Sequence, residues 1–389
     1  MKITMLGGGV AGVGCAIALK LQGFDVEVYE RHAVASNIGA GIVVWPNAAY
    51  VLDQLGVWSE LESVSGQPSR MRRFSSDNED LGAIDIELIN RRLGYPSLSV
   101  LRSDFLGILI ARFESLGGAI RYAHDVAEIE AGLAGRARVR FGNGTWIEPD
   151  VVVGADGRMA SHARRFVHGD ATPVYQGFVN WVGVCESAED TFEDIVVDDY
   201  WGVGERVGIV PVTRRKAYWA AGAACAEVGV SDRSRYRDEL RSLLCRWPRR
   251  VRRIVERTPV ERINKIHVHD HDPIRRWHRG NLILVGDAAH APLPTSGQGA
   301  CQALEDAWHL ARYLKESPGD LQRAFAGFTQ ARLEKTTNII MAGRGLAASL
   351  FNRDEGFCRA RNESSRSTDY PALATAMARG WAQGLPIGA

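Results

Sequence analysis

The pattern of apolar and polar residues predicts an N-terminal unit in which strands and helices alternate. Residues 3–6 form a short apolar run, and residues 10–21 carry apolar side chains at helical spacing. Further apolar runs of strand length lie at residues 26–29, 98–101, 151–153 and 282–285. Strands that alternate with helices favour a parallel sheet covered by helices, so we predict an α/β fold with a Rossmann-like domain.

The pattern changes after residue 174, where short aromatic-rich strands follow one another without intervening helices. The sequence Asn143-Gly144 already predicts a hairpin between residues 139–141 and 146–148. The later strands are predicted at residues 175–185, 199–202, 207–212, 217–223 and 263–271. We expect a second, mostly antiparallel β-sheet domain, interrupted by a helix over residues 233–246.

Apolar spacing over residues 321–348 predicts C-terminal helices, and the mixed composition after residue 352 favours a partly mobile tail. These patterns together predict three parts of the chain. The α/β domain takes residues 1–67, 97–173 and 274–320, the sheet domain takes 68–96 and 174–273, and the helical segment takes 321–389.

Composition and charge argue against nucleic acid and membranes as binding partners. The 389 residues carry a formal charge of +1, so no overall field attracts nucleic acid or an acidic membrane surface. No apolar run approaches the length of a membrane span, and the N-terminus enters a strand directly, without a signal peptide. Six scattered cysteines form no CxxC pair and suit reduced thiols, so we expect a cytoplasmic protein, monomer or homodimer.

The first candidate site is the glycine-rich turn after residue 6. Gly7 permits a tight turn, Gly9 allows a pyrophosphate to approach the helix N-terminus, and Gly12 allows the helix to pack closely on the strand. Glu30, followed by Arg31, ends the second strand 18 residues after Gly12 and can accept hydrogen bonds from ribose hydroxyls. This strand, turn and helix predict a dinucleotide site.

Two further acids follow predicted strands. Asp156 lies in Gly154-Ala155-Asp156-Gly157, and Asp287 follows Gly286 at the end of the run 282–285. Pro294, Gly297 and Gly299 then lead into a helix that begins near Gln298. An acid at a strand end can bind sugar-type hydroxyls, and glycines at a helix N-terminus let backbone N–H groups approach negative charge.

These motifs resemble the single-component FAD-dependent aromatic hydroxylases of the p-hydroxybenzoate hydroxylase class. The resemblance implies that Asp287 binds the ribityl chain, the helix end faces the flavin pyrimidine, and Asp156 lies near the pyrophosphate. It also implies that the segment from Gly39 through Gly41 to residue 46 flanks the isoalloxazine ring and that Arg102 lies near the flavin phosphates. Ser161 and Arg164 stand one residue later than in the family pattern, so their roles stay open.

The segment Val44-Trp45-Pro46-Asn47 and the spacing of three pocket residues are similar to the FAD-dependent urate hydroxylases. Asn180, Arg206 and Tyr218 are the predicted catalytic residues, and Arg206 would hold or activate an anionic ring. The alternative is that Arg206 pairs with a surface acid while the aromatic residues fill the sheet core. Thr295 stands where those enzymes carry an acid, which points to a different substrate.

The activity implied by the resemblance is hydroxylation of a small, electron-rich aromatic or N-heterocyclic substrate. NADH or NADPH reduces bound FAD, and O2 then forms a flavin hydroperoxide that donates its distal oxygen. A single dinucleotide fingerprint agrees with tightly held FAD and a nicotinamide cofactor that binds transiently. Two alternatives stay open: a flavoprotein that sequesters a ligand without turnover, and an epoxidase or halogenase-like enzyme, although the halogenase signature Trp-x-Trp-x-Ile-Pro is absent.

Histidines do not change this picture. His267, His269 and His271 would share one face of a strand, but residues two apart spread over about 13 Å, too far for three ligands of one ion. No metal site is therefore expected. His290 has no GxSxG or reactive-cysteine context, and we expect it to order the loop beside the flavin.

Overall fold

The structure is a computed structural model that describes residues 1–35, 40–132 and 135–388. Its first layer is a six-stranded sheet in the order β17-β18-β11-β1-β2-β7, which is parallel except for β17 at one edge. The strands are β1 (Lys2–Leu6), β2 (Asp25–Tyr29), β7 (Ile120–Arg121), β11 (Val151–Gly154), β17 (His278–Arg279) and β18 (Leu282–Leu284). The central strands are apolar almost throughout because helices cover the sheet.

Helices of this layer are packed closely through small residues. The first helix, α1 (Val10–Leu21), contacts α10 (Gly299–Glu316) and α5 (Arg102–Ser115). A side chain at Gly14 of α1 would come within 3.2 Å of Leu304 in α10. The other helices near this layer are α2 (Pro46–Gln54), α3 (Trp58–Ser63), α4 (Ile86–Leu93), α6 (His162–His168) and α9 (Asp287–His290).

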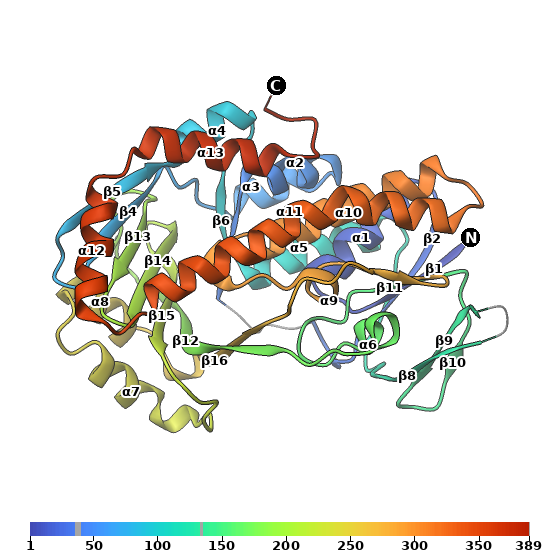
Figure 1. Cartoon of the computed structure of the whole chain (residues 1–389), viewed down its shortest axis with the longest axis horizontal. Helices are drawn as coiled ribbons and strands as arrows, with labels where there is room; N and C mark the ends of the chain where they lie inside the picture. Colours follow the sequence, from blue (N-terminus) through green and yellow to red (C-terminus); the bar gives the residue numbers. More distant parts are fainter. Residues whose placement is uncertain (36–39, 133–134, 389) are drawn as a thin grey trace.

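The second layer is a seven-stranded sheet in the order β16-β12-β15-β14-β13-β4-β5, with only the β13–β4 pair parallel. It lies at the opposite end of the molecule from β1 and β2 (Figure 1). Its strands are β4 (Arg70–Ser75), β5 (Asp80–Asp85), β12 (Val174–Glu186), β13 (Val197–Trp201), β14 (Glu205–Thr213), β15 (Lys216–Ala224) and β16 (Ile263–Asp270).

The two faces of this sheet have different neighbours. Val207, Ile209 and Trp219 point to the face covered by α7 (Tyr236–Leu243) and α8 (Arg249–Glu256), which we call the outer face. Val210 and Tyr218 belong to the main core that includes the six-stranded sheet, and we call their side the inner face. The inner face therefore meets the predicted nucleotide unit.

Two small sheets complete the strands. A two-stranded sheet pairs β3 (Gly41–Val44) with β6 (Leu98–Leu101). Along the chain, these two strands stand just before and just after β4 and β5 of the seven-stranded sheet. A three-stranded sheet consists of β8 (Val126–Ala131), β9 (Ala137–Phe141) and β10 (Trp146–Ile147). The predicted Asn143-Gly144 hairpin is confirmed as the β9–β10 connection. Short 3-10 turns lie at Arg233–Arg235, Val260–Arg262 and Pro294–Ser296.

The C-terminal part is helical to its end. The 30-residue helix α11 (Leu321–Leu350) runs from beside α10 to the seven-stranded sheet, and α12 (Glu355–Arg366) and α13 (Tyr370–Ala382) continue over β5 and α4 (Figure 1). The expectation of a partly mobile tail is wrong, because α13 buries Ala374, Ala378 and Trp381. Among the described residues, no helix has the length and apolar character needed to cross a membrane.

The predicted α/β fold class, with its antiparallel second sheet and C-terminal helices, is confirmed. Two local expectations need correction. By residue type, Ser103 suits the N-cap of a helix predicted over residues 104–116, but it does not cap that helix. Helix α5 begins at Arg102 after Leu101, since β6 holds the chain up to that residue. The stretch 233–246 holds a 3-10 turn and α7, and a separate helix, α8, follows it. The limits proposed for the three parts of the chain stay a proposal.

Candidate functional site

The glycine turn after β1 is built so that α1 starts at an open space. Gly7 has a φ of +116°, and a side chain there would lie 2.3 Å from the Ala155 carbonyl oxygen. A side chain at Gly12 would lie 1.8 Å from the Gly7 carbonyl oxygen, so this glycine permits the close approach of helix and turn. Gly9 is the N-cap of α1, and a side chain there would meet nothing within 4 Å. The unpaired N–H groups of α1 thus face room for an anion.

Glu30 lies at the end of β2 beside this turn. Its Oε2 accepts a hydrogen bond from the Gly8 N–H at 2.7 Å, and its Oε1 accepts from the His32 N–H at 2.9 Å. The side chain of His32 lies 2.6 Å from the same Oε1. Glu30 is 9% exposed, whereas Arg31 is exposed. The carboxylate that could bind a ribose is therefore held against the glycine turn.

Asp156 follows β11 and fixes the start of α6. Its Oδ1 accepts a hydrogen bond from the Ser161 hydroxyl at 2.5 Å, and its Oδ2 accepts from the Ala163 N–H at 3.0 Å. Burial raises the pKa of Asp156, although these hydrogen bonds act against it. Ser161 also caps α6 by accepting from the Arg164 N–H. The extra residue in this motif therefore leaves Ser161 within reach of the acid.

Arg164 joins this motif to the one around Asp287. Its Nη1 donates to the carbonyl oxygens of Ala288 and Ala289 at 3.0 and 3.1 Å, and its Nη2 donates to the Asp272 carbonyl oxygen at 3.0 Å. Burial lowers the pKa of Arg164 to about 10, with nearby acids acting against it. The guanidinium thus holds α9 from behind and sets the position of Asp287 at its first turn.

Asp287 faces two arginines. Arg158 Nε lies 3.3 Å from Asp287 Oδ2, and both side chains are about a third exposed, at 32% and 34%. Burial lowers the pKa of Arg102, and the charge of Asp287 opposes this shift. The buried Nε of Arg102 has no hydrogen-bond partner among the described residues. A buried donor without a partner is costly, so this arginine suits a bound anionic or polar group.

The N-terminus of α10 forms the other side of the site. Pro294 opens a 3-10 turn, and Gly297 with a φ of +62° passes the chain to Gln298, the N-cap before Gly299. Trp45 Nε1 donates to the Gly297 carbonyl oxygen at 3.0 Å. Asn47 donates to the Gln298 side chain at 3.0 Å and to Glu305 Oε1 at 2.7 Å. The first turn of α10 is therefore fixed by α2 and keeps its own N–H groups for a ligand.

A fully buried cluster of charges lies behind this helix start. Glu305 and Asp306 of α10 face Arg332 and Lys335 of α11, all with side chains at most 4% exposed. Arg332 binds Glu305 Oε2 through Nη1 and Asp306 Oδ1 through Nε at 2.8 Å, while Lys335 binds Glu305 Oε1 at 2.9 Å. Burial alone would raise the pKa of Asp306, but His290 and Arg332 lower it to about 2.

This cluster also anchors the C-terminal helix. Lys335 Nζ donates to the carbonyl oxygens of Trp381 and Gln383 at 2.7 and 2.9 Å. The ring of Trp381 lies 4.7 Å from the ring of Trp45, which binds Gly297. The end of α13 and the start of α10 are thus connected through one buried group of residues.

The three predicted catalytic residues share the inner face of the seven-stranded sheet. Asn180 pairs with Gly222, Gly222 pairs with Arg206, and Tyr218 stands four residues before Gly222 on β15. Paired residues of antiparallel strands point to one face, as do residues two or four apart on a strand. Arg206 donates through Nε to Asp199 Oδ1 at 2.7 Å. Arg206 therefore does pair with an acid, but this acid is buried, with its side chain only 6% exposed.

Small residues leave a hollow between these side chains. The paired residues Gly208 and Ala220 lie between Tyr218 and Arg206 on this face. A Cβ atom added at Gly208 would have no other atom within 4 Å. Tyr218 packs directly on Gly41 of β3, where a side chain would come within 2.0 Å of its ring. Burial raises the pKa of the Tyr218 hydroxyl well above its ordinary range. The inner face thus offers an open position near Gly41, which belongs to the segment predicted to flank the flavin ring.

Several other residues considered in the sequence analysis are not brought together with this site. Gly39 lies outside the described residues. Thr295 donates its hydroxyl to the Gly343 carbonyl oxygen of α11 at 3.0 Å. His267 accepts from the Gly229 N–H, and His271 donates to the Arg158 carbonyl oxygen, so these histidines serve separate contacts. Among the described residues, no group of three or more His, Cys, Asp or Glu side chains could hold a metal ion.

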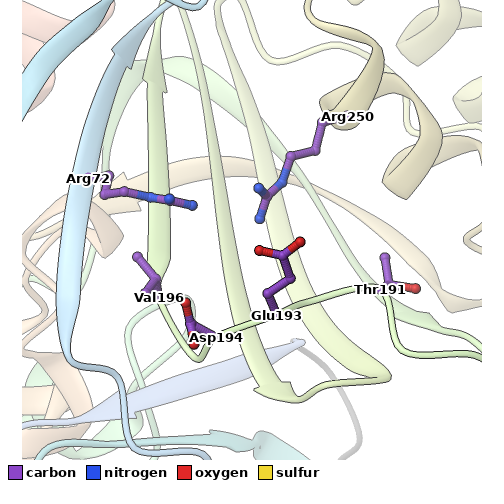
Figure 2. A pocket seen from close by; sticks show the side chains of 6 residues that line it. All are labelled: Arg72, Thr191, Glu193, Asp194, Val196 and Arg250. Carbon is purple, nitrogen blue, oxygen red and sulfur yellow. The ribbon is translucent and has the colours of Figure 1, made fainter.

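Two cavities of the protein lie elsewhere. One, of about 150 Å³, lies near the outer side of the seven-stranded sheet, where Arg72 and Arg250 face Glu193 and Asp194 (Figure 2). The other, of about 320 Å³, is lined by residues of β8, α6 and β17, including Phe166. Neither is lined by the glycine turn, Asp287 or Arg206.

Sequence reasoning missed several residues that shape the site. Arg158 and Asp199 were not singled out, Asn47 was named only within the segment of residues 44–47, and the acids Glu305 and Asp306 received no role. Two acids inside an apolar helical pattern were a signal, because charged residues are almost never buried without partners. Their common partner, Arg332, lies 27 positions after Glu305 and 26 after Asp306, and it carried no such local signal.

Comparisons with known proteins agree with this geometry. A family model described as FAD binding domain matches residues 1–319. An aurachin C monooxygenase/isomerase of Stigmatella aurantiaca is 30% identical over 344 residues, which cover 87% of each chain. An FAD-dependent urate hydroxylase of Klebsiella oxytoca is 30% identical over 357 residues, covering 88% of this chain and 89% of that protein.

Solved structures show the same fold. The structure of Klebsiella pneumoniae HpxO complexed with FAD and uric acid matches with a TM-score of 0.91 and 25% identity, covering 99% of this chain and 97% of that one. The expected resemblance to FAD-dependent aromatic hydroxylases is confirmed by these relatives. The glycine turn, the two acid motifs and the match over most of the chain lead to one conclusion: this chain belongs to the FAD-binding domain family of monooxygenases.

Proposed function

We propose that the chain is a single-component monooxygenase that uses FAD, NADH or NADPH, and O2 to hydroxylate a small, electron-rich aromatic or N-heterocyclic substrate. One observation carries the proposal: the start of β3 at Gly41, with Tyr218 packed on it, joins the nucleotide unit to the inner sheet face that holds Arg206 and Asn180. A cofactor site and a polar ring-binding face thus adjoin.

The residues fit FAD at three places. The N-terminus of α1 at Gly9, with Gly7 and Gly12, would take the pyrophosphate, and Glu30 would take the adenosine ribose. Asp287 would accept from ribityl hydroxyls and Arg102 would approach the phosphates, which gives its buried Nε a partner. When bound, FAD would supply the redox and oxygen chemistry, and the chain would supply orientation and electrostatics.

Two features of the protein would assist that chemistry. Gly297 leads the chain into α10, and the first turn of this helix, from Gly299, has N–H groups without partners in the helix. These groups would stabilise negative charge on a bound ligand. Asp156 with Ser161, and Arg164 of α6 through its hydrogen bonds to α9, would keep the pyrophosphate and ribityl sides of the site in fixed relation. The nicotinamide cofactor would bind transiently, because the sequence carries one dinucleotide fingerprint.

The substrate proposal rests on Arg206, Tyr218 and Asn180. A guanidinium with two neutral hydrogen-bonding groups suits a planar ring that is anionic or readily deprotonated. Relatives are named for urate, for 6-hydroxynicotinate and for aurachin C. Thr295 stands where the urate hydroxylases carry an acid, and its hydroxyl donates to the Gly343 carbonyl oxygen. Urate is therefore one candidate substrate among several.

The test of this proposal compares substrates in the wild type and in Arg206→Lys. Substrate-dependent oxygen uptake would be measured with urate, 6-hydroxynicotinate, salicylate and an uncharged quinolone. We expect an anionic ring to be the best substrate, and we expect Arg206→Lys to reduce its turnover strongly, because an ammonium cannot reproduce a bidentate grip. If the quinolone is best and the arginine change is silent, this assignment of the pocket is wrong.

Three finer points belong to the same proposal. A reducing, cytoplasmic location is supported by six free cysteines, four of them buried. A monomer or homodimer remains the proposed assembly. A flavoprotein that sequesters a ligand is the second candidate, and consumption of NADH without any oxygenated product would favour it.

A further inference from the structure

The partner of Arg206 is an acid on the neighbouring strand. Asp199 of β13 accepts the Arg206 Nε–H at Oδ1, 2.7 Å away, and accepts the Trp201 indole N–H at Oδ2, 2.9 Å away. Both carboxylate oxygens are therefore occupied, and the side chain is only 6% exposed. Asp199 stands opposite Gly208, the residue above which the inner face is open.

The hydrogen bond to Asp199 uses one edge of the guanidinium and leaves the other. Among the described residues, the guanidinium of Arg206 makes no hydrogen bond besides the one from Nε, and its side chain is 25% exposed. The two Nη groups stay available, and these are the groups that bind a carboxylate or a ring with two acceptors end-on. A long arginine side chain would otherwise lose considerable rotamer entropy when it binds a ligand.

We infer that Asp199 is a positioning residue for substrate binding: it fixes Arg206 through Nε so that both Nη groups meet the ring-binding space beside Gly208. The inference rests on the proposed function in that the substrate binds on this sheet face. Asp199 itself need not touch the substrate, because its two oxygens are already engaged. It acts through Arg206.

The surrounding charges make the pair suitable for an anion in spite of the acid. Arg73 stands beside Asp199 in the pairing of β4 with β13, and its guanidinium lies 4.9 Å from the Trp201 ring centre. Arg361 of α12 lies 5.4 Å from the same ring. Arg206 thus binds the carboxylate, and two more arginines lie at the ring of Trp201, its other partner, so the local charge stays positive in spite of the acid.

Two substitutions separate orientation from charge. Asp199→Asn removes the charge but keeps an oxygen that accepts the Arg206 Nε–H. Asp199→Ala removes the charge and the accepting oxygen. The two variants therefore both lack the charge, and they differ in whether residue 199 can still accept the hydrogen bond that anchors Arg206. The probe is whichever of urate, 6-hydroxynicotinate and salicylate the FAD-loaded wild type binds most tightly, and calorimetry measures its dissociation constant without turnover.

The neighbouring Asp198 supplies the matched control. It lies on the same strand with its side chain 1% exposed, but it points to the outer face, where Arg72 Nη2 and Arg250 Nη2 lie 2.7 and 2.9 Å from its oxygens. These two arginines line the small cavity on that side of the sheet (Figure 2). Asp198→Asn and Asp198→Ala disturb the same strand without touching Arg206.

The expected result is a dissociation constant about tenfold weaker in Asp199→Ala than in Asp199→Asn, since the anchor fixes a rotamer-rich side chain. Asp199→Asn should bind the anionic probe at least as tightly as the wild type. In an Arg206→Met background, Asp199→Ala should change binding by less than about twofold, because the partner is gone. The Asp198 pair should differ little.

Equal binding in Asp199→Ala and Asp199→Asn would overturn the inference, as would the same loss in the Asp198 pair or in the Arg206→Met background. A protein that binds the probe but forms no oxygenated product would contradict the proposed function instead. The two failures are distinguishable because the calorimetric measurement requires no reaction.

Discussion

Nε2 of His290 lies 2.5 Å from Oδ2 of Asp306, and the same oxygen accepts the Gly286 N–H at 2.8 Å. Both ends of α9 are thereby tied to one carboxylate, and Asp287 stands between them. His290 therefore does order the segment around Asp287, and it does so through an acid of α10. The position of the proposed ribityl contact depends on the buried charges that α11 supplies.

Replacement of Arg332 by Met tests this dependence. Because Arg332 is fully buried between Glu305 and Asp306, its loss leaves carboxylates without their partner, and breaking such a pair costs about 3–5 kcal/mol. We expect this fall in the free energy of unfolding, measured with urea, and a lower FAD content at equal protein concentration. Arg323→Met, at an exposed position of the same helix, should leave both quantities close to the wild type.

Replacement of Asp287 by Ala tests the ribityl contact directly. The side chain is partly exposed and its ion pair with Arg158 is partly exposed too, so its removal should leave the fold intact. The purified variant should be folded but poor in FAD, as measured by the ratio of flavin to protein absorbance and by circular dichroism. Asp272→Ala, which removes a 72% exposed acid nearby in sequence, is the control. An undiminished flavin content in Asp287→Ala would remove this assignment.

Replacement of Gly9 by Ala tests whether the open space at α1 is a phosphate site. The backbone at Gly9 has a φ of −81°, which any residue adopts, and no protein atom lies within 4 Å of the added carbon. The apoprotein should therefore keep its stability while FAD binds more weakly, because the methyl group fills space meant for the ligand. Gly107→Ala in α5 also has nothing within 4 Å and should not change FAD affinity. Titration of apoprotein with FAD measures both.

His309 predicts a pH dependence of stability. Its ring nitrogens have no hydrogen-bond partner among the described residues, and burial, with the charges of Arg332 and Arg312 adding to it, lowers its pKa to about 3. Below the ordinary histidine pKa of about 6.5 the unfolded chain binds a proton that the folded chain does not. Stability should therefore fall as pH drops through this window, down to the folded pKa.

The substitution His309→Phe removes this contribution. Between about pH 7 and about pH 5, its free energy of unfolding should fall by about 1–2 kcal/mol less than that of the wild type, since each unit of difference is worth about 1.4 kcal/mol. Urea unfolding at several pH values measures the difference. His168→Phe changes an exposed histidine and should keep the wild-type slope; parallel slopes for all three proteins would contradict the account.

Local patterns predicted the elements well because strands, turns and helices depend on neighbouring residues. The helix over residues 10–21 matches α1, and the Asn143-Gly144 hairpin is present. Ser103 was a reasonable cap by residue type, yet the pairing of β6 with β3 holds the chain until Leu101 and the helix starts at once. The tail after residue 352 has weak apolar periodicity, and its order comes from docking, for example through Lys335.

The site was predictable only where a motif carries it. Gly7, Asp156 and Asp287 stand in short motifs, but the pairing of Arg206 with Asp199 depends on the register of β13 against β14. Spacing along the chain contains no register, so the sequence left both a surface acid and a substrate contact open as partners of Arg206. The structure replaces these alternatives with a buried acid that leaves part of the guanidinium unpaired.

The proposed reaction inserts one oxygen atom from O2 into an aromatic ring. The most direct measurement incubates the FAD-loaded protein with NADH or NADPH, each aromatic probe in turn, and dioxygen labelled with the heavy oxygen isotope, and then determines the product masses. We expect one probe to accelerate NAD(P)H oxidation and to gain a single labelled oxygen atom, as this reaction requires. Oxidation of NAD(P)H that yields only hydrogen peroxide with every probe, and no labelled product, would contradict it.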